Sequence, residues 1–191
     1  MTQLDYPRWL SNSTRQRTAS DPTVGSTGGG TRPRIETRHT TPLDPRAQLV
    51  LRDLEREYDA RYGNLFGEPA SVEIARYPTD AFSAPGGTFL LLEVDGAPVS
   101  AGAFMTIDAA TVEFKRMWTH ADHRGRGLAK LVLAELEAEA GRRGFTRVVL
   151  STGPRQPEAV RLYLATGYTP LFDRTQRAEQ IVIHHFEKEL S

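Results

Sequence analysis

The sequence contains no cysteine among its 191 residues. A chain without cysteine can form no disulfide, no thiolate metal site and no thiol nucleophile, which fits a reducing compartment. No apolar run approaches the roughly 20 residues that a membrane-spanning helix requires. The amino terminus also lacks the apolar core that follows the basic residues of a signal peptide. We therefore expect a cytoplasmic protein without a membrane partner.

The chain also has no net charge, because 24 Lys and Arg residues balance 24 Asp and Glu residues. Without an overall field, nothing draws the protein to nucleic acid or to an anionic membrane, so any charged site has to be local. No internal repeat is present, and the 39% hydrophobic content allows one substantial core. These properties predict a single folded domain.

Residues 1–33 contain few side chains that could form a core. They are rich in Ser, Thr, Gly and Arg, and the tract TVGSTGGGTRPR has no hydrophobic periodicity. We therefore predict a flexible or disordered tail. Its scattered arginines admit a nucleic-acid or partner-binding role, but their spacing is typical of an ordinary solvated tail. The folded domain is expected over residues 34–191.

The domain is expected to alternate strands and helices in the order βαβββαβαββ. Strand 35–40 precedes a helix over 45–62, with Asp44 as its N-cap, Pro45 at its first position and Gly63 at its end. The later elements are three antiparallel strands, a helix, a buried parallel strand, a helix and two closing strands, over 88–94, 98–107, 111–119, 126–143, 147–152, 157–165, 168–172 and 180–186. This is an α/β (α+β) fold with a mixed, mostly antiparallel sheet and helices on both faces.

Two of the expected helices carry apolar residues at spacings of three and four, which predicts the face that each one buries. These residues are Leu49, Val50, Leu54 and Tyr58 in the first helix, and Leu128, Leu131, Val132 and Leu136 in the second. Residues 64–87 contain several Pro and Gly and predict no element beyond a short turn of helix.

The most informative stretch is residues 111–130, TVEFKRMWTHADHRGRGLAK, where a strand leads through a turn into a glycine-rich loop and a helix. Small residues at the start of this helix leave consecutive backbone N–H groups uncovered. The first N–H groups of a helix have no intrahelical partner, and the helix dipole adds partial positive charge there. Such a site binds anions, and a pyrophosphate fits it.

The loop sequence R-G-R-G-L-A, residues 124–129, fits the pattern Arg/Gln-x-x-Gly-x-Gly/Ala of the GNAT superfamily of N-acetyltransferases. The segment EFKRMWTH resembles the central strand of that family, and TGPRQPEAVRLYLATGY resembles its second cofactor-contacting segment. The likeness spans residues 33–187. It implies a GNAT fold, acetyl-CoA as cosubstrate, and acetyl transfer to a primary amine of a small molecule, peptide or protein by direct attack in a ternary complex.

The resemblance also implies roles for individual residues. In similar proteins the central strand splays from its neighbour and its main chain pairs with pantetheine, so the Met117 N–H is the candidate donor to the thioester oxygen and the oxyanion. Tyr163 is the candidate acid for the leaving thiolate. The family often has Asn where this chain has Gln156, which is the expected substitute. The cofactor contacts implied are Met117, Trp118, Thr119, Arg124, Gly125, Arg126, Gly127, Leu128, Ala129, Lys130 and Gln156.

Glu113 is the candidate general base. In a regular strand its side chain would share one face with those of Lys115, Met117 and Thr119, because side chains alternate with a period of two. The carboxylate would then take a proton from the acceptor's ammonium group, directly or through a water. The alternative is an ordinary surface ion pair with Lys115 or Arg116.

Two other functions fit parts of the sequence. A non-catalytic acyl-CoA-binding module would need the same loop, although a tyrosine at position 163 favours catalysis. A dinucleotide site fits poorly, because G-R-G-L-A-K lacks the third glycine and no βαβ unit precedes it. His120 and His123 flank the loop without a third ligand, so no metal is expected. The end strand over 180–186 would suit a homodimer interface.

Overall fold

The protein is described by a computed structural model that covers residues 34–190, apart from 64, 66, 178 and 179. The tail expected over 1–33 lies outside these residues. The elements are β1 (Ile35–Thr40), α1 (Pro45–Tyr62), α2 (Ala70–Ala75), η2 (Thr79–Phe82), β2 (Gly87–Val94), β3 (Ala97–Thr106), β4 (Thr111–Thr119), η3 (Ala121–His123), α3 (Leu128–Arg142), β5 (Arg147–Thr152), α4 (Pro157–Ala165), β6 (Thr169–Pro170) and β7 (His184–Glu189). The predicted order is confirmed, and α2 and two short 3-10 helices are added to it.

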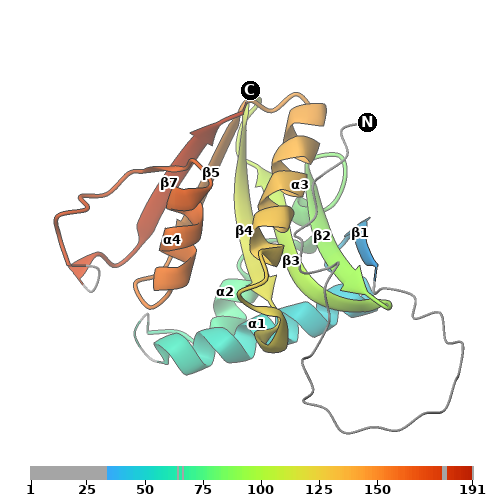
Figure 1. Ribbon diagram of the computed structural model, residues 1–191, viewed down its shortest axis with the longest axis horizontal. Helices are drawn as coiled ribbons and strands as arrows, with labels where there is room; N and C mark the ends of the chain where they lie inside the picture. The colour runs from blue at the N-terminus through green and yellow to red at the C-terminus, as the bar shows by residue number, and fades with distance from the viewer. Residues whose placement is uncertain (1–33, 64, 66, 178–179, 191) are drawn as a thin grey trace, which may run out of the picture.

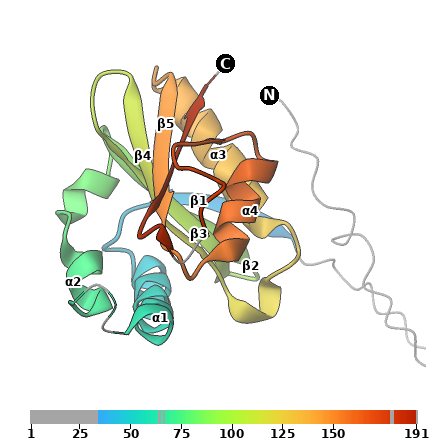
Figure 2. The same cartoon turned by 90° about the vertical axis from the view of Figure 1, so that its left-hand side faces the viewer.

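One sheet of seven strands forms the centre of the fold, in the order β1-β2-β3-β4-β5-β7-β6. Among the strand pairs of the described residues, only β4–β5 is parallel, which confirms the mixed, mostly antiparallel sheet. Helices α3 and α4 cover one face and α1 covers the other (Figures 1 and 2). The core therefore has two layers, one built on Val132 and Leu136 of α3 and one built on Val50 and Leu54 of α1.

Local signals set the ends of α1. The Asp44 carboxylate accepts a hydrogen bond from the Arg46 N–H at 2.8 Å, and Gly63 ends the helix with a φ of 49°. The predicted buried face was wrong at Leu49, whose side chain is 52% exposed. The residues fully buried in the first turns are Ala47, Val50 and Leu54, and Leu49 lies one residue, or about 100° of helix, away from that stripe.

The closing strands differ from the prediction. The strand expected over 180–186 begins at His184 instead, because Val182 and Ile183 are exposed residues of the preceding loop. The strand expected over 168–172 is reduced to the two residues of β6. Strand β7 pairs with β5 along its length and with β6 over two residues, so β6 covers only part of its other edge. The homodimer expected at this strand stays a prediction.

Candidate functional site

Strands β4 and β5 separate halfway along their length. Their parallel pairing runs from Thr111 and Arg147 to Phe114 and Leu150, and there it ends. Strand β3 continues to pair with β4 as far as Thr119. In Figure 1 the two strands diverge from their paired ends. Over residues 115–119, no strand in the described part of the chain covers β4 on its β5 side, so the backbone there is left for another partner.

A β-bulge at Arg116 changes the direction of the side chains in β4. Arg116 has a φ of 59°, and the β3–β4 register shifts opposite it. Phe114 and Trp118 would share a face in a regular strand, yet they belong to the two opposite core layers. The expectation that Glu113 shares a face with Met117 was therefore wrong, because the bulge inserts one residue between them.

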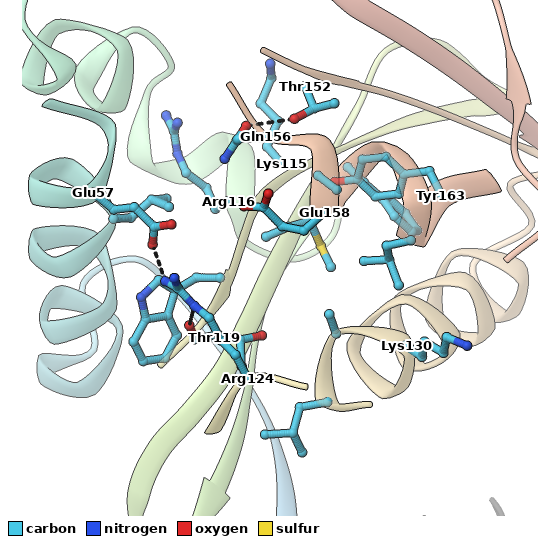
Figure 3. A pocket seen from close by; sticks show the side chains of 18 of the residues that line it. Glu57, Lys115, Arg116, Thr119, Arg124, Lys130, Thr152, Gln156, Glu158 and Tyr163 are labelled. Carbon is cyan, nitrogen blue, oxygen red and sulfur yellow. Dashed lines mark hydrogen bonds and ion pairs between the residues drawn. The ribbon is translucent and has the colours of Figure 1, made fainter. Parts of the chain in front are cut away.

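A cleft of about 570 Å³ occupies the opening between the strands. Its floor is β4 from residue 114 to residue 119, its walls come from α1 and α4, and the glycine-rich loop and first turn of α3 border it (Figure 3). The size is within the usual range for small-molecule sites, roughly 300–1,000 Å³. Segments distant in the sequence thus meet around one cavity.

The cleft carries a local excess of positive charge. Five cationic side chains and two carboxylates line it. The cations are Arg61, Lys115, Arg116, Arg124 and Lys130, and the carboxylates are Glu57 and Glu158. Because the chain as a whole has no net charge, this excess belongs to the site itself. Such a site favours a ligand with several negative charges.

The glycine-rich loop leads into α3 through two left-handed residues. Gly125 and Gly127 have φ values of 73° and 80°, a region that side chains with a Cβ adopt at a cost. The first intrahelical bonds go from the N–H groups of Lys130 and Leu131 to the Gly127 carbonyl. The N–H groups that precede them in this turn have no intrahelical acceptor. Leu128 is 1% exposed and belongs to the core layer under α3, so its side chain anchors the start of the helix beside the cleft.

Arg124, the first residue of the loop motif, points toward α1. Its Nε donates to the Thr119 carbonyl at 3.0 Å and its Nη2 donates to the Glu57 carboxylate at 2.7 Å (Figure 3). Lys130 lines the cleft from the first turn of α3 and is exposed, whereas Arg126 is exposed and lies outside the lining residues. Ala129 lines the cleft between them.

The three cofactor contacts expected on β4 have side chains that lie in different surroundings. The Met117 side chain is partly buried and packs against the core layer under α3, and the residue lines the cleft floor. The indole of Trp118 is buried on the α1 side, and its Nε1 donates to Asp53 at 2.8 Å. The Thr119 hydroxyl lies 2.9 Å from that of Ser100. A ligand in the opening would therefore meet main-chain atoms of this strand.

Tyr163 and Gln156 line the cleft from the side of α4. Tyr163 is 3% exposed, its ring packs against those of Tyr168 and Phe186, and its hydroxyl points into the cleft (Figure 3). Burial raises the pKa of this hydroxyl well above its ordinary value, so the group stays protonated. Gln156 accepts a hydrogen bond from the Thr152 hydroxyl at 2.7 Å, which fixes its amide at the end of β5.

Glu113 does not line the cleft. Its carboxylate lies 2.9 Å from Nζ of Lys115, and the same ammonium group lies over the ring of Tyr77 at 4.5 Å. The structure thus gives Glu113 an ion pair on the α1 and α2 side of the sheet. Lys115, rather than Glu113, reaches the cleft.

Helix α1 contributes residues to this site that were not predicted from the sequence. Leu54, Glu57, Tyr58 and Arg61 all line the cleft. They follow one another at i, i+3, i+4 and i+7, which places them on a single stripe of the helix. That spacing can be read from the sequence. The residues that Glu57 and Arg61 contact, Arg124 and Glu158, lie far away in the chain, so the sequence does not indicate that this stripe faces a site.

Within residues 34–190 as described, no group of three or more His, Cys, Asp or Glu side chains could hold a metal ion. His120 instead accepts a hydrogen bond from the Asp122 N–H at 3.3 Å and starts η3. No helix in the same part of the chain is long and apolar enough to span a membrane.

Proteins with related sequences or folds are described as acetyltransferases or N-acetyltransferases. The uncharacterized N-acetyltransferase YjgM of Escherichia coli is 27% identical over 136 residues, which are 69% of this chain and 79% of YjgM. The PaiA N-acetyltransferase of Thermoplasma acidophilum, solved with coenzyme A, shares the fold at a TM-score of 0.63 and 16% identity, over 82% of this chain and 99% of PaiA. YncA of Salmonella typhimurium, solved with acetyl-CoA, has a TM-score of 0.59 and 20% identity, over 82% of this chain and 94% of YncA.

The sequence also matches a family model. The match covers residues 51–168, which include α1 from residue 51 onward, the splayed strand, the glycine-rich loop and α4. It extends over more than half of the chain, so the protein belongs to the acetyltransferase (GNAT) family.

Proposed function

We propose that the protein transfers the acetyl group of acetyl-CoA to a primary amine of a small molecule, peptide or protein, by direct attack within a ternary complex. The observation that carries this proposal is the opening between β4 and β5. It brings an unpaired strand edge, an anion-binding helix start and a buried tyrosine hydroxyl into one cleft. The complexes of PaiA with coenzyme A and of YncA with acetyl-CoA support the choice of cosubstrate.

Successive segments of the cleft suit successive parts of acetyl-CoA, from the pyrophosphate to the pantetheine arm. We assign the pyrophosphate to the backbone N–H groups between Gly125 and Lys130, where the α3 dipole and the excess of cations favour negative charge. The pantetheine arm would extend along residues 115–119 of β4 and pair with their main chain. Gln156 is placed to bond one of its amides from the opposite wall.

The amine then attacks the thioester carbonyl beside Met117. We propose that the Met117 N–H donates to the carbonyl oxygen as it becomes an oxyanion, a contribution of about 3 kcal/mol where comparable donors have been removed. No residue needs to carry the acetyl group, because holding two reactants together can itself supply roughly 7–11 kcal/mol. The absence of cysteine is therefore no obstacle to the reaction.

Tyr163 is proposed to assist the leaving thiolate. Its raised pKa keeps the hydroxyl protonated until charge develops on the sulfur. The same apolar surroundings raise the proton affinity of the thiolate, so the hydrogen bond strengthens as the C–S bond breaks. The contribution of Tyr163 therefore falls mainly on the transition state.

We propose water as the first acceptor of the proton that the ammonium group must lose. Glu113 is the residue that the sequence suggested for this role, but it does not line the cleft and its carboxylate is engaged by Lys115. Glu158 lines the cleft with a half-exposed side chain that is bound to Arg61 at 2.6 Å. Bulk water that enters beside it gives the proton a route out.

The test is the release of free thiol from acetyl-CoA in the presence of a panel of primary amines. The expected result is release that depends on both substrates and saturates with each, together with an acetylated amine identified by mass spectrometry. Binding of acetyl-CoA without transfer to any small-molecule, peptide or protein amine would instead identify a non-catalytic acyl-CoA-binding module.

A further inference from the structure

Four charged side chains form a continuous chain across one side of the cleft. Arg124 of the glycine-rich loop contacts Glu57 of α1 at 2.7 Å, and Glu57 contacts Arg61 one turn later at 2.7 Å. Arg61 also contacts Glu158, at the start of α4, at 2.6 Å. The charges alternate in sign, so each contact is attractive. The chain thus connects the loop, α1 and α4, which are separate segments of the cleft wall. Figure 3 shows its contact between Arg124 and Glu57.

Glu57 occupies the middle of this chain, and both of its oxygens are engaged. Oε1 accepts from Nε of Arg61 at 2.9 Å, and Oε2 accepts from Nη2 of Arg124 at 2.7 Å. The side chain is 20% exposed, so the carboxylate is partly shielded from solvent. A carboxylate bound by two guanidinium groups is held in place.

Arg124 has two anchors and each fixes part of its guanidinium plane. One is the Thr119 carbonyl at the end of β4, and the other is Glu57. The backbone of Arg124 leads directly into Gly125 and Gly127, whose left-handed conformations shape the anion-binding turn. The first residue of that turn is thus bound by a side chain of α1 that lies 67 residues earlier in the chain.

We propose that Glu57 is a positioning residue for acetyl-CoA, which holds the glycine-rich loop in its binding conformation through Arg124. Glu57 touches neither the cofactor nor the reacting atoms in this role. The inference rests on the proposed function, because it assumes that acetyl-CoA occupies the loop. Its consequence is that the effect of Glu57 on binding must be transmitted by Arg124.

The variant Glu57→Gln keeps the size of the side chain and removes its charge. Arg124 is 45% exposed, so the contact is partly screened, and the expected effect is about fivefold weaker binding of coenzyme A. In an Arg124→Gln background the link no longer exists, so Glu57→Gln should change the affinity less than about twofold. Glu55→Gln is the matched control, because Glu55 lies on the same helix and does not line the cleft.

Calorimetry with coenzyme A is performed on the parent, both single variants, the double variant and the control. Steady-state kinetics of each protein then separate KM for acetyl-CoA from kcat. We expect a raised KM with kcat within about twofold of the parent for Glu57→Gln, and parental values for Glu55→Gln. Equal losses of affinity in both Arg124 backgrounds, or unchanged affinity in Glu57→Gln, would overturn the positioning role. A loss of kcat with affinity retained would also overturn it, since Glu57 would then act on the chemical step.

The same experiment separates this inference from the proposed function. If the parent protein binds no coenzyme A, the proposed function fails, and the role of Glu57 in binding fails with it. If the parent binds and the variants bind equally well, only the role of Glu57 fails. The Arg124→Gln variant breaks the same contact from the other side, so the test does not depend on one substitution.

Discussion

Gly102 of β3 lies opposite the β4 bulge, and one added methyl group at this position probes the packing that forms the cleft floor. A Cβ at Gly102 would lie 2.7 Å from Sδ of Met117, 2.7 Å from Cγ1 of Val132 and 2.9 Å from Cδ1 of Leu136. All three atoms are side-chain atoms, two of them in α3. The variant Gly102→Ala therefore pushes at once on the strand that carries Met117 and on the helix that follows the glycine-rich loop.

The size of the effect follows from these distances. Carbon atoms in contact sit about 3.5–4.0 Å apart, so each neighbour has to retreat by roughly 1 Å. Overpacking of this kind costs about 1–3 kcal/mol. In a domain of this size each kcal/mol lowers Tm by about 2–4 °C, which predicts a fall of roughly 2–12 °C. A displacement of about 1 Å at Met117 is also enough to reduce turnover by up to roughly 10²-fold.

The assay compares Gly102→Ala with Gly141→Ala, in which the same methyl group is added to α3. A Cβ at Gly141 would meet no atom within 4 Å. Alanine is favoured over glycine inside a helix, so Gly141→Ala should stabilise the protein by about 0.5–1 kcal/mol. Thermal and urea unfolding give the stabilities, and thiol release from acetyl-CoA gives the turnover.

Unfolding of Gly102→Ala at the temperature of the parent would refute this prediction, because the packing opposite the bulge would then have room for a methyl group. A loss of stability with full turnover would support the overpacking at Gly102. It would contradict the claim that catalysis depends on the position of Met117.

Three further predictions concern the loop, the acid and a buried histidine. Gly127→Glu should abolish acetyl-CoA binding in calorimetry, whereas Gly96→Glu, at a turn glycine with a similar φ of 78°, should affect stability alone; unchanged affinity in folded Gly127→Glu would contradict the loop assignment. Tyr163→Phe should lower kcat by about 10²-fold with little change in coenzyme A affinity, and an unaltered kcat would return Tyr163 to a packing role. Burial lowers the pKa of His184 below 6.5, so the stability that the neutral ring provides is present above about pH 6.5 and is lost as the pH falls. The Tm of His184→Phe should therefore decline less between about pH 7 and pH 5 than the Tm of the parent, and parallel curves would disprove this.

Features that depend on neighbours in the sequence could be predicted without the structure. Helix α4 begins at Pro157 and ends at Ala165 as expected, because a proline at the first helical position and a glycine after the last turn are local signals. The glycine-rich loop and the parallel strand β5 were also predicted correctly as elements. The assignment of the loop to a pyrophosphate stays a prediction, which rests on the anion-binding property that the backbone of a helix start provides.

The start of α3 shows the limit of such signals. The helix was expected to begin at residue 126 but begins at Leu128, after the left-handed Gly127. The side-chain spacing is compatible with either start. The choice depends on the φ angles of the loop, which the spacing of apolar residues does not report.

The bulge at Arg116 was decided by tertiary packing. Nothing in the sequence marks an arginine for a φ of 59°, a conformation that costs energy for a residue with a Cβ. The guanidinium is buried and its Nη2 donates to the carbonyls of Glu73 and Ile74 at 3.0 and 2.9 Å, contacts that hold the residue in place. Because of this bulge, the side chains of Glu113 and Met117 lie on opposite faces of β4.

The sequence by itself determined the order of elements, the helix boundaries with strong caps, and the loop that identifies the family, since each of these arises from residues close together in the chain. Only the tertiary structure decided which side chains of β4 face the cleft, where β7 begins, and that Glu57 reaches Arg124. These outcomes depend on contacts between residues far apart in the sequence, such as the 67 positions that separate Glu57 from Arg124. A local pattern limits which side chains are available, whereas packing selects the partners that they meet.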